Sequence, residues 1–140
     1  MYALDSDSVT LFLHHKKQQP KLAKRVLGVP ADQVWISIIT VKEAIGGVMA
    51  LIDNPKRAAM AARDCAFLRQ IMRDLTDFQI LPYDEAARQI FAGMTAAEKR
   101  VGGNDCKIAA SAMSRNFTVV TRNTKDFLQI RGVLCEDWTK

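Results

Sequence analysis

Four acidic side chains stand where apolar segments of the sequence begin or end. Asp5, Glu43 and Asp126 each come shortly after a short apolar, β-branched stretch, and Asp105 opens the segment that leads into such a stretch. Carboxylates brought close together repel one another and do not all stay ionised without a cation. Oxygen-only clusters suit hard ions such as Mg²⁺ or Mn²⁺. The chemistry that such an ion supports is hydrolysis of a phosphate ester.

These carboxylates meet only if the fold brings them to one place. Short apolar segments predict strands at 1–4, 34–39, 78–81, 117–121 and 133–136. Helical patterns alternate with them, at 9–15, 20–27, 40–52, 55–75, 84–100 and 104–115. The alternation predicts one α/β domain over residues 1–140, with a central, mostly parallel, twisted sheet of about five short strands flanked by helices.

Local signals predict where two of the helices start. Asp7 or Ser6 is a candidate N-cap for the first helix, which leaves Asp5 as a turn residue. Thr40 and Glu43 have the spacing of a capping box, so the third helix is expected to start at Thr40. Three cysteines without a CxxC pair are interpreted as small buried residues rather than as a disulfide framework.

An open parallel sheet forms its binding sites beyond the carboxyl ends of its strands. Asp5, Glu43 and Asp126 follow strands, and Asp105 starts a helix that returns antiparallel to the next strand, so all four belong to that edge. Each acid alone is explained by a helix cap or a turn. Together the four predict a metal site in which they are also the catalytic carboxylates.

Two neighbouring residues are candidates for the fourth ligand of the metal ion. Asn123 comes directly after Thr121-Arg122 but offers only a neutral carbonyl oxygen, whereas Asp126 is a carboxylate. If 123–127 form a helical turn, Asp126 lies on the same face as Asn123. The alternative is an ion pair between Asp126 and Arg122 that steadies the loop. Asp126 is predicted as the ligand, with Thr121 and Asn123 as supporting residues.

The positive charge is unevenly distributed along the chain. The formal net charge is +5, and the segment 99–131 alone holds seven basic residues and two acids. Such a segment is either a solvated face or a surface for a polyanion. The candidates for contacting phosphates beside the acidic edge are Arg100, Lys107, Arg122 and Lys125. No apolar run approaches the ~18 residues of a membrane span, and the start lacks a signal-peptide pattern, so a cytoplasmic protein is expected.

Five stretches, in chain order, resemble PIN-domain proteins, and specifically VapC-type toxin ribonucleases. They cover nearly the whole chain and lie at 2–7, 36–47, 103–110, 119–127 and 132–138. The resemblance implies a three-layer PIN-like fold and a Mg²⁺- or Mn²⁺-dependent endoribonuclease of a type II toxin–antitoxin system. It also implies an RNA substrate, homodimers, and inhibition by a cognate antitoxin that packs on the helices of the toxin.

The resemblance also assigns residues. Asp5, Glu43 and Asp105 fall on three central acids of the family. Where many members carry a fourth acid, this chain has Asn123, and Asp126 follows three residues later. For the antitoxin, a stripe of small residues predicts a shallow groove that suits a partner helix; it comprises Ala58, Ala62, Cys65 and Ala66.

Two other functions remain open at this point. Asp5-Ser6-Asp7 after an apolar strand resembles the nucleophile motif of haloacid-dehalogenase-type phosphatases, with Asp5 as the nucleophile, although the later carboxylate pair of that family is missing. A catalytically silent PIN fold that serves only as a binding module is the second alternative. The two alternatives predict a phosphoenzyme on Asp5 and intact binding without cleavage, respectively.

Overall fold

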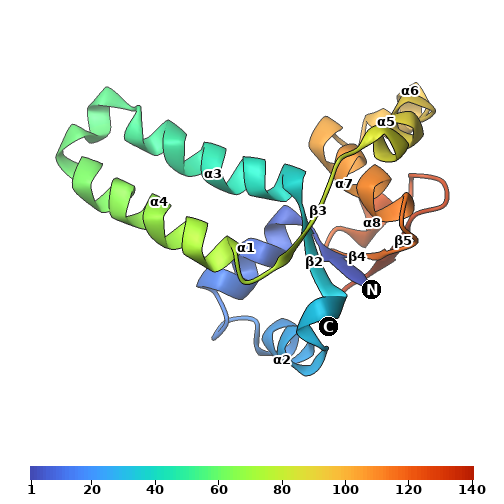
Figure 1. Cartoon of the computed structure of the whole chain (residues 1–140), viewed down its shortest axis with the longest axis horizontal. Coiled ribbons are helices and arrows are strands. Elements are labelled where there is room, and N and C mark those ends of the chain that lie inside the picture. Colours follow the sequence, from blue (N-terminus) through green and yellow to red (C-terminus); the bar gives the residue numbers. More distant parts are fainter.

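The computed structural model describes all 140 residues and contains one five-stranded parallel sheet (Figure 1). The spatial order is β3-β2-β1-β4-β5. The strands are β1 (Tyr2–Leu4), β2 (Val34–Ser37), β3 (Gln79–Leu81), β4 (Thr118–Val120) and β5 (Leu134–Glu136). The predicted α/β class and the five short strands are confirmed, and every neighbouring pair is parallel.

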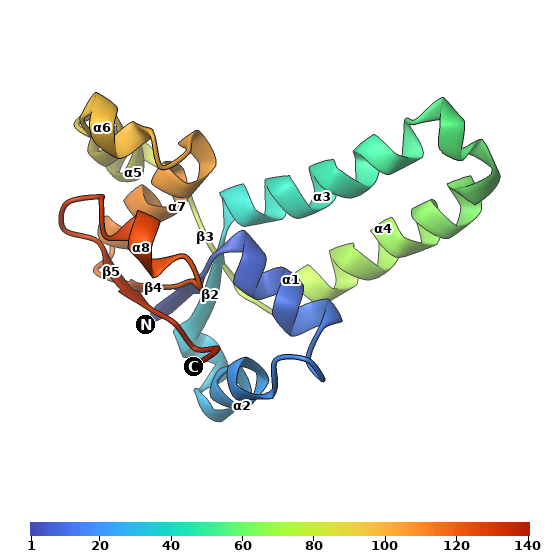
Figure 2. The same ribbon diagram turned by 180° about the vertical axis from the view of Figure 1, so that it is seen from behind.

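Eight α-helices and two 3₁₀ turns connect and cover the strands. The helices are α1 (Ser6–His14), α2 (Pro20–Gly28), α3 (Ile38–Ile52), α4 (Ala61–Leu75), α5 (Glu85–Ala92), α6 (Ala96–Lys99), α7 (Gly103–Met113) and α8 (Thr124–Phe127). The 3₁₀ turns span Ala31–Gln33 and Pro55–Met60. Helices α3 and α4 run side by side as an arm that projects from the body of the molecule (Figures 1 and 2). No helix combines the length and the apolar character that a bilayer crossing requires.

The two faces of the sheet each carry a hydrophobic core, which gives the three layers expected of the fold. On one face, Ala3 and Val119 pack with buried residues of α7 and with Phe127 of α8. On the other face, Leu4 and Val120 pack with apolar residues of α1, α2, α3 and α4 and with Trp138. Because side chains alternate across a strand, these short strands are apolar on both faces.

The register of the sheet aligns the ends of its central strands. Leu4 of β1 pairs with Ile36 of β2 and with Val120 of β4. The next residues along these three strands are Asp5, Ser37 and Thr121, which therefore lie at the same level on the carboxyl edge. The edge that the sequence predicts as the site is thus built from three adjacent chain segments.

Two helices start earlier than their sequence signals indicate. Helix α1 starts at Ser6 and has Asp5 as its N-cap, so the predicted start near Val9 is wrong and Asp5 is more than a turn residue. Helix α3 starts at Ile38 because the Ser37 side chain accepts the N–H of Ile39 at 3.1 Å. The expected capping box at Thr40 is therefore absent, and Thr40 lies inside the helix.

Two predicted long helices are interrupted. The segment 55–75 begins as a 3₁₀ turn in which Arg57 has non-helical backbone angles, and α4 starts only at Ala61. The segment 84–100 is divided into α5 and α6 by a new N-cap at Thr95. The small-residue stripe is correspondingly broken between Ala58 and the residues in α4. Of the cysteines, Cys106 is buried as expected, but Cys65 is exposed; all three are free.

Candidate active site

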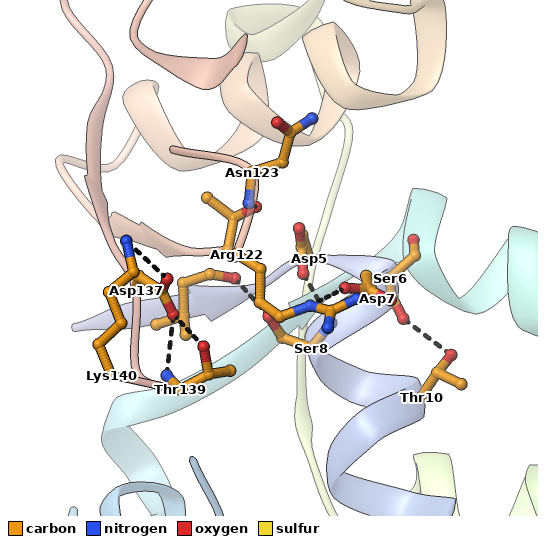
Figure 3. A network of polar contacts seen from close by, with 12 residues as sticks. Asp5, Ser6, Asp7, Ser8, Thr10, Arg122, Asn123, Asp137, Thr139 and Lys140 are labelled. Carbon is orange, nitrogen blue, oxygen red and sulfur yellow. Dashed lines mark hydrogen bonds and ion pairs between the residues drawn. The ribbon is translucent and has the colours of Figure 1, made fainter. Parts of the chain in front are cut away.

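Asp5 lies at the end of β1 and is almost completely buried, with 5% of its surface exposed. Its carboxylate accepts the backbone N–H of Ser8 at 2.7 Å, and the Ser8 hydroxyl in turn donates to the carbonyl oxygen of Val120 at 3.0 Å (Figure 3). Burial raises the pKa of Asp5, and the Thr121 hydroxyl beside it acts in the opposite direction. Thr121 is itself buried and accepts the N–H of Asn123 at 2.9 Å, which is consistent with a supporting role.

Glu43 reaches the same edge from the second turn of α3. Its carboxylate accepts a 2.7 Å hydrogen bond from the hydroxyl of Ser6, the first residue of α1. The same hydroxyl lies 3.3 Å from the Thr40 hydroxyl. Ser6 therefore links α1 to α3 directly beside Asp5. The sequence marks Ser6 as a cap candidate and as part of the Asp5-Ser6-Asp7 motif, but its contact with Glu43, 37 residues away, leaves no local signal.

Asp105 is positioned by the start of α7. Gly102 precedes this helix with a φ of +134°, a conformation that favours glycine, and Asp105 then falls in the first helical turn. The rest of α7 is anchored in the core by a run of buried residues that includes Cys106 and Ile108. Burial and the negative charges of Asp5, Glu43 and Asp126 raise the pKa of Asp105 to about 6.

Asp126 lies in α8 and is held by neutral neighbours. It accepts a hydrogen bond from the Asn123 side chain at 2.6 Å and a weaker one from Gln129 at 3.3 Å. Arg122 instead pairs with Asp7 at 2.8 Å, so the alternative of an Asp126–Arg122 ion pair is wrong. In Figure 3 the Asn123 amide is directed away from Asp5.

The four basic residues that are predicted to contact phosphates differ in their exposure and in the contacts that they already make. Arg100 and Lys125 are exposed. Arg122 is half exposed but engaged by Asp7. The ammonium of Lys107 lies 5.6 Å from the ring centre of Phe91 in α5. Arg100 and Lys125 are thus the most available of the four.

The donor set fits a hard divalent cation in its chemistry, although the side chains do not converge on one point. No three Asp, Glu, His or Cys side chains form a group that could hold a metal ion as they stand. Glu43 is turned to Ser6 and Asp126 to Asn123, so both would exchange a neutral donor for the cation. Burial and the mutual repulsion of the carboxylates both raise the pKa of Asp105, and a bound cation would remove the repulsion.

The chain is similar to known proteins in both sequence and fold. The family model described as PIN domain matches residues 3–133. The chain is 28% identical over 127 residues to the tRNA(fMet)-specific endonuclease VapC of Shigella flexneri, covering 88% of this chain and 89% of the relative. It is 31% identical over 111 residues to Toxin FitB of Neisseria gonorrhoeae, covering 76% and 77%. The crystal structure of FitAcB from Neisseria gonorrhoeae superimposes with a TM-score of 0.78 at 26% identity, over 99% of this chain and 98% of that chain.

Proposed function

The chain belongs to the PIN domain family, and we propose that it is a Mg²⁺- or Mn²⁺-dependent endoribonuclease that acts as the toxin of a type II toxin–antitoxin system. The observation that carries the proposal is the placement of Asp5 at the carboxyl end of β1 with Glu43 and Asp105 in early turns of α3 and α7, where burial and the neighbouring carboxylates raise the pKa of Asp105. An RNA substrate is supported by the relative named as a tRNA(fMet)-specific endonuclease. The toxin role is supported by the relative named Toxin FitB.

In this proposal Asp5, Glu43, Asp105 and Asp126 hold the cation and are the catalytic carboxylates. A bound Mg²⁺ or Mn²⁺ would bind the phosphate, activate a water and stabilise the leaving oxygen. The buried Thr121 hydroxyl orients the Asp5 carboxylate, and Asn123 fixes Asp126 by its side-chain amide.

Cations around the carboxylates would hold the phosphates on either side of the scissile bond. Arg100 and Lys125 are free to do so. Arg122 would have to leave Asp7, and Lys107 would have to leave the ring of Phe91. All four carry the positive charge that an RNA backbone needs next to an acidic site.

The test is cleavage of RNA by the purified protein. We expect cutting with Mg²⁺ or Mn²⁺, none in EDTA, and none by Asp105→Asn. Asp53→Asn is the matched control, because it makes the same change of charge at the exposed C-cap of α3. Undiminished cleavage by Asp105→Asn, or equal cleavage in EDTA, would overturn the proposal.

The same preparation separates the two alternatives. A haloacid-dehalogenase-type phosphatase would form a phosphoenzyme on Asp5 with a small phosphate ester, and we expect none. A catalytically silent PIN fold would bind its protein partner but would not cleave RNA with either Mg²⁺ or Mn²⁺ added. Neither alternative gains support from the relatives that the chain matches.

We further propose that a cognate antitoxin and a second copy of the chain are its protein partners, in the cytoplasm. A mainly apolar hollow of about 590 Å³ between α1, α2 and the end of α4 could take an antitoxin segment; Phe12, Val26 and Phe78 are among its lining residues. Exposed Ile80 and Leu134 on the two edge strands supply apolar surface for association. Co-expression with a neighbouring antitoxin gene should give a stable complex with suppressed cleavage, and light scattering of the toxin alone should give twice the chain mass.

A further inference from the structure

Helix α2 carries positive charge that the proposed active site does not use. The segment 8–31 contains five Lys or Arg residues and no acidic residue. Lys21, Lys24 and Arg25 lie in α2 with the spacing i, i+3 and i+4, so they share one face of the helix. Leu22 and Val26, on another face, are buried in the core.

The basic face of α2 borders a hollow of about 470 Å³ that also includes the C-terminal Lys140. We name it the α2 hollow; its lining residues are Lys21, Lys24, Arg25, Gly28, Val29 and Lys140. No acidic side chain lines it. The α2 hollow is therefore a shallow, open surface with positive charge, unlike the apolar hollow lined by Val26 and Leu27 of the same helix.

The cations of the α2 hollow are of two kinds. Arg25 is fixed by an ion pair with Glu136 at 3.0 Å and lies over the ring of the buried Trp138 at 4.7 Å. Lys140 pairs loosely with Asp137 at 3.5 Å. Lys21 and Lys24 form no ion pair. The hollow thus keeps two uncompensated charges on a helix that is anchored to the sheet.

The α2 hollow is connected to the acidic site through Glu136 at the end of β5. Val120 pairs with Glu136, and the N–H of Thr121 donates to the carbonyl oxygen of Glu136 at 2.9 Å. Glu136 therefore links Arg25 on one side to Thr121, which supports Asp5, on the other. Figure 2 shows α2 next to the C-terminus, and Figure 3 draws the ion pair of Asp137 and Lys140.

We propose that the α2 hollow binds the phosphate backbone of the RNA substrate at nucleotides beyond the scissile bond. The inference rests on the proposed ribonuclease function and extends its substrate surface. A polyanion is the occupant whose charge complements unpaired lysines, and backbone contacts of this kind position a nucleic acid without reading its sequence. The lining holds no aromatic side chain on which a base could stack, so the hollow contacts phosphates rather than bases.

The test is RNA binding by the full-length protein in EDTA, where nothing is cleaved. The probe is a fluorescein-labelled single-stranded RNA titrated at several salt concentrations. The variant is the double substitution Lys21→Gln and Lys24→Gln. We expect about tenfold weaker binding at low salt and a salt dependence whose log–log slope is shallower by about 1.4, since each phosphate contact on a single strand contributes about 0.7.

A matched pair of cations on the arm provides the control. Lys56 and Arg69 are exposed and form no ion pair, so Lys56→Gln with Arg69→Gln removes the same charge at a distance from the sheet edge. This control should keep the slope of the unmodified protein. If both double variants change the slope equally, the effect depends only on the net charge of the protein and not on the α2 hollow. That result would overturn the proposal.

The remaining outcomes separate this proposal from the proposed function. If the unmodified protein cuts RNA but the Lys21/Lys24 variant binds with unaltered affinity and slope, the proposal for the α2 hollow is wrong and the ribonuclease stands. If that variant instead loses only its complex with the antitoxin, the hollow is a protein interface and the proposal is again wrong. If the unmodified protein neither binds nor cuts RNA, the ribonuclease itself is wrong.

Discussion

The carboxylate of Asp5 accepts the backbone N–H of Ser8 at 2.7 Å, so the residue at the end of β1 is also the N-cap of α1. One buried side chain thereby starts a helix and faces the cluster of carboxylates. The two roles need different properties. A cap needs only an oxygen acceptor, whereas a ligand of a hard cation benefits from negative charge.

Asp5→Asn should separate these roles. Asn is as good an N-cap as Asp, so α1 keeps its start while the negative charge is lost. We expect RNA cleavage to fall to the level seen in EDTA. Because burial raises the pKa of Asp5 and so disfavours its charged form, the metal-free variant should melt at or above the temperature of the unmodified protein.

Asp5→Ala is the control for the cap. It removes the acceptor for Ser8 as well as the charge, and a lost cap costs about 1 kcal/mol. Thermal melts of both variants in EDTA should therefore differ, with Ala clearly the lower. Equal melting of the Asn and Ala variants would show that the cap does not contribute to stability.

Ser6 should act on Glu43 through their 2.7 Å hydrogen bond. Ser6→Ala leaves Glu43 without its partner and frees its rotamers, so Mn²⁺ affinity is expected to weaken by about tenfold, as is typical when a partner of a metal ligand is removed. Ser6→Thr keeps the hydroxyl and should restore most of the affinity. Calorimetric titration with Mn²⁺ measures both, and equal affinity of the Ala and Thr variants would contradict the role.

The fourth ligand can be decided by comparing Asp126→Asn with Asn123→Ala. Asp126 accepts the Asn123 amide at 2.6 Å, so Asn123 holds the carboxylate rather than replacing it. We expect Asp126→Asn to reduce Mn²⁺ affinity and cleavage strongly and Asn123→Ala to reduce them mildly. If Asp126→Asn leaves both unchanged while Asn123→Ala weakens them, Asn123 is the ligand.

The sheet and its edge were predictable because their signals are local. The predicted stretches 1–4, 34–39 and 117–121 contain β1, β2 and β4, and the parallel pairing of Leu4 with Ile36 and Val120 brings the following residues to one level. That α3 is capped by Ser37 rather than by Thr40 was not predictable in the same way. Both residues are competent caps, and the choice depends on where β2 stops, which is set by the pairing of Ser37 with Leu81.

Side-chain ion pairs that leave no pattern in the sequence account for two further differences. The helix predicted at 55–75 is interrupted where Arg57 turns back to form a two-pronged ion pair with the buried Asp64, at 2.8 and 3.1 Å. The apolar pattern that predicted this helix contains no signal of the ion pair. The same holds for the Arg122–Asp7 bridge, whose partners are 115 residues apart. Sequence patterns placed Arg122 near the site but could not identify which acid it contacts.

The pH dependence of stability follows from Asp105, and its sign is the reverse of that for an ion-paired carboxylate. Its pKa is raised from 3.8 to about 6 by burial and by three neighbouring carboxylates. Between these two values the unfolded chain ionises Asp105 while the folded protein retains the proton. The contribution of Asp105 to the stability of the metal-free fold therefore falls as the pH rises from about 4 to about 6 and changes no further above that range. Other carboxylates, such as Asp84 and Glu98, have lowered pKa values and contribute with the opposite sign.

Subtracting the melting curve of Asp105→Asn isolates the contribution of Asp105, because the other carboxylates are common to both proteins. In EDTA, the melting temperature of the unmodified protein minus that of Asp105→Asn should fall as the pH is raised from 4.5 to 6.5, a window set by the pKa of about 6. With Mn²⁺ the difference should reverse, since a cation favours the ionised carboxylate and competes with its proton. The melting shift produced by Mn²⁺ should accordingly shrink below the pKa of about 6. If this difference in melting temperature does not change with pH in EDTA, the pKa of Asp105 is not raised by folding. The other three carboxylates then do not act on Asp105 electrostatically.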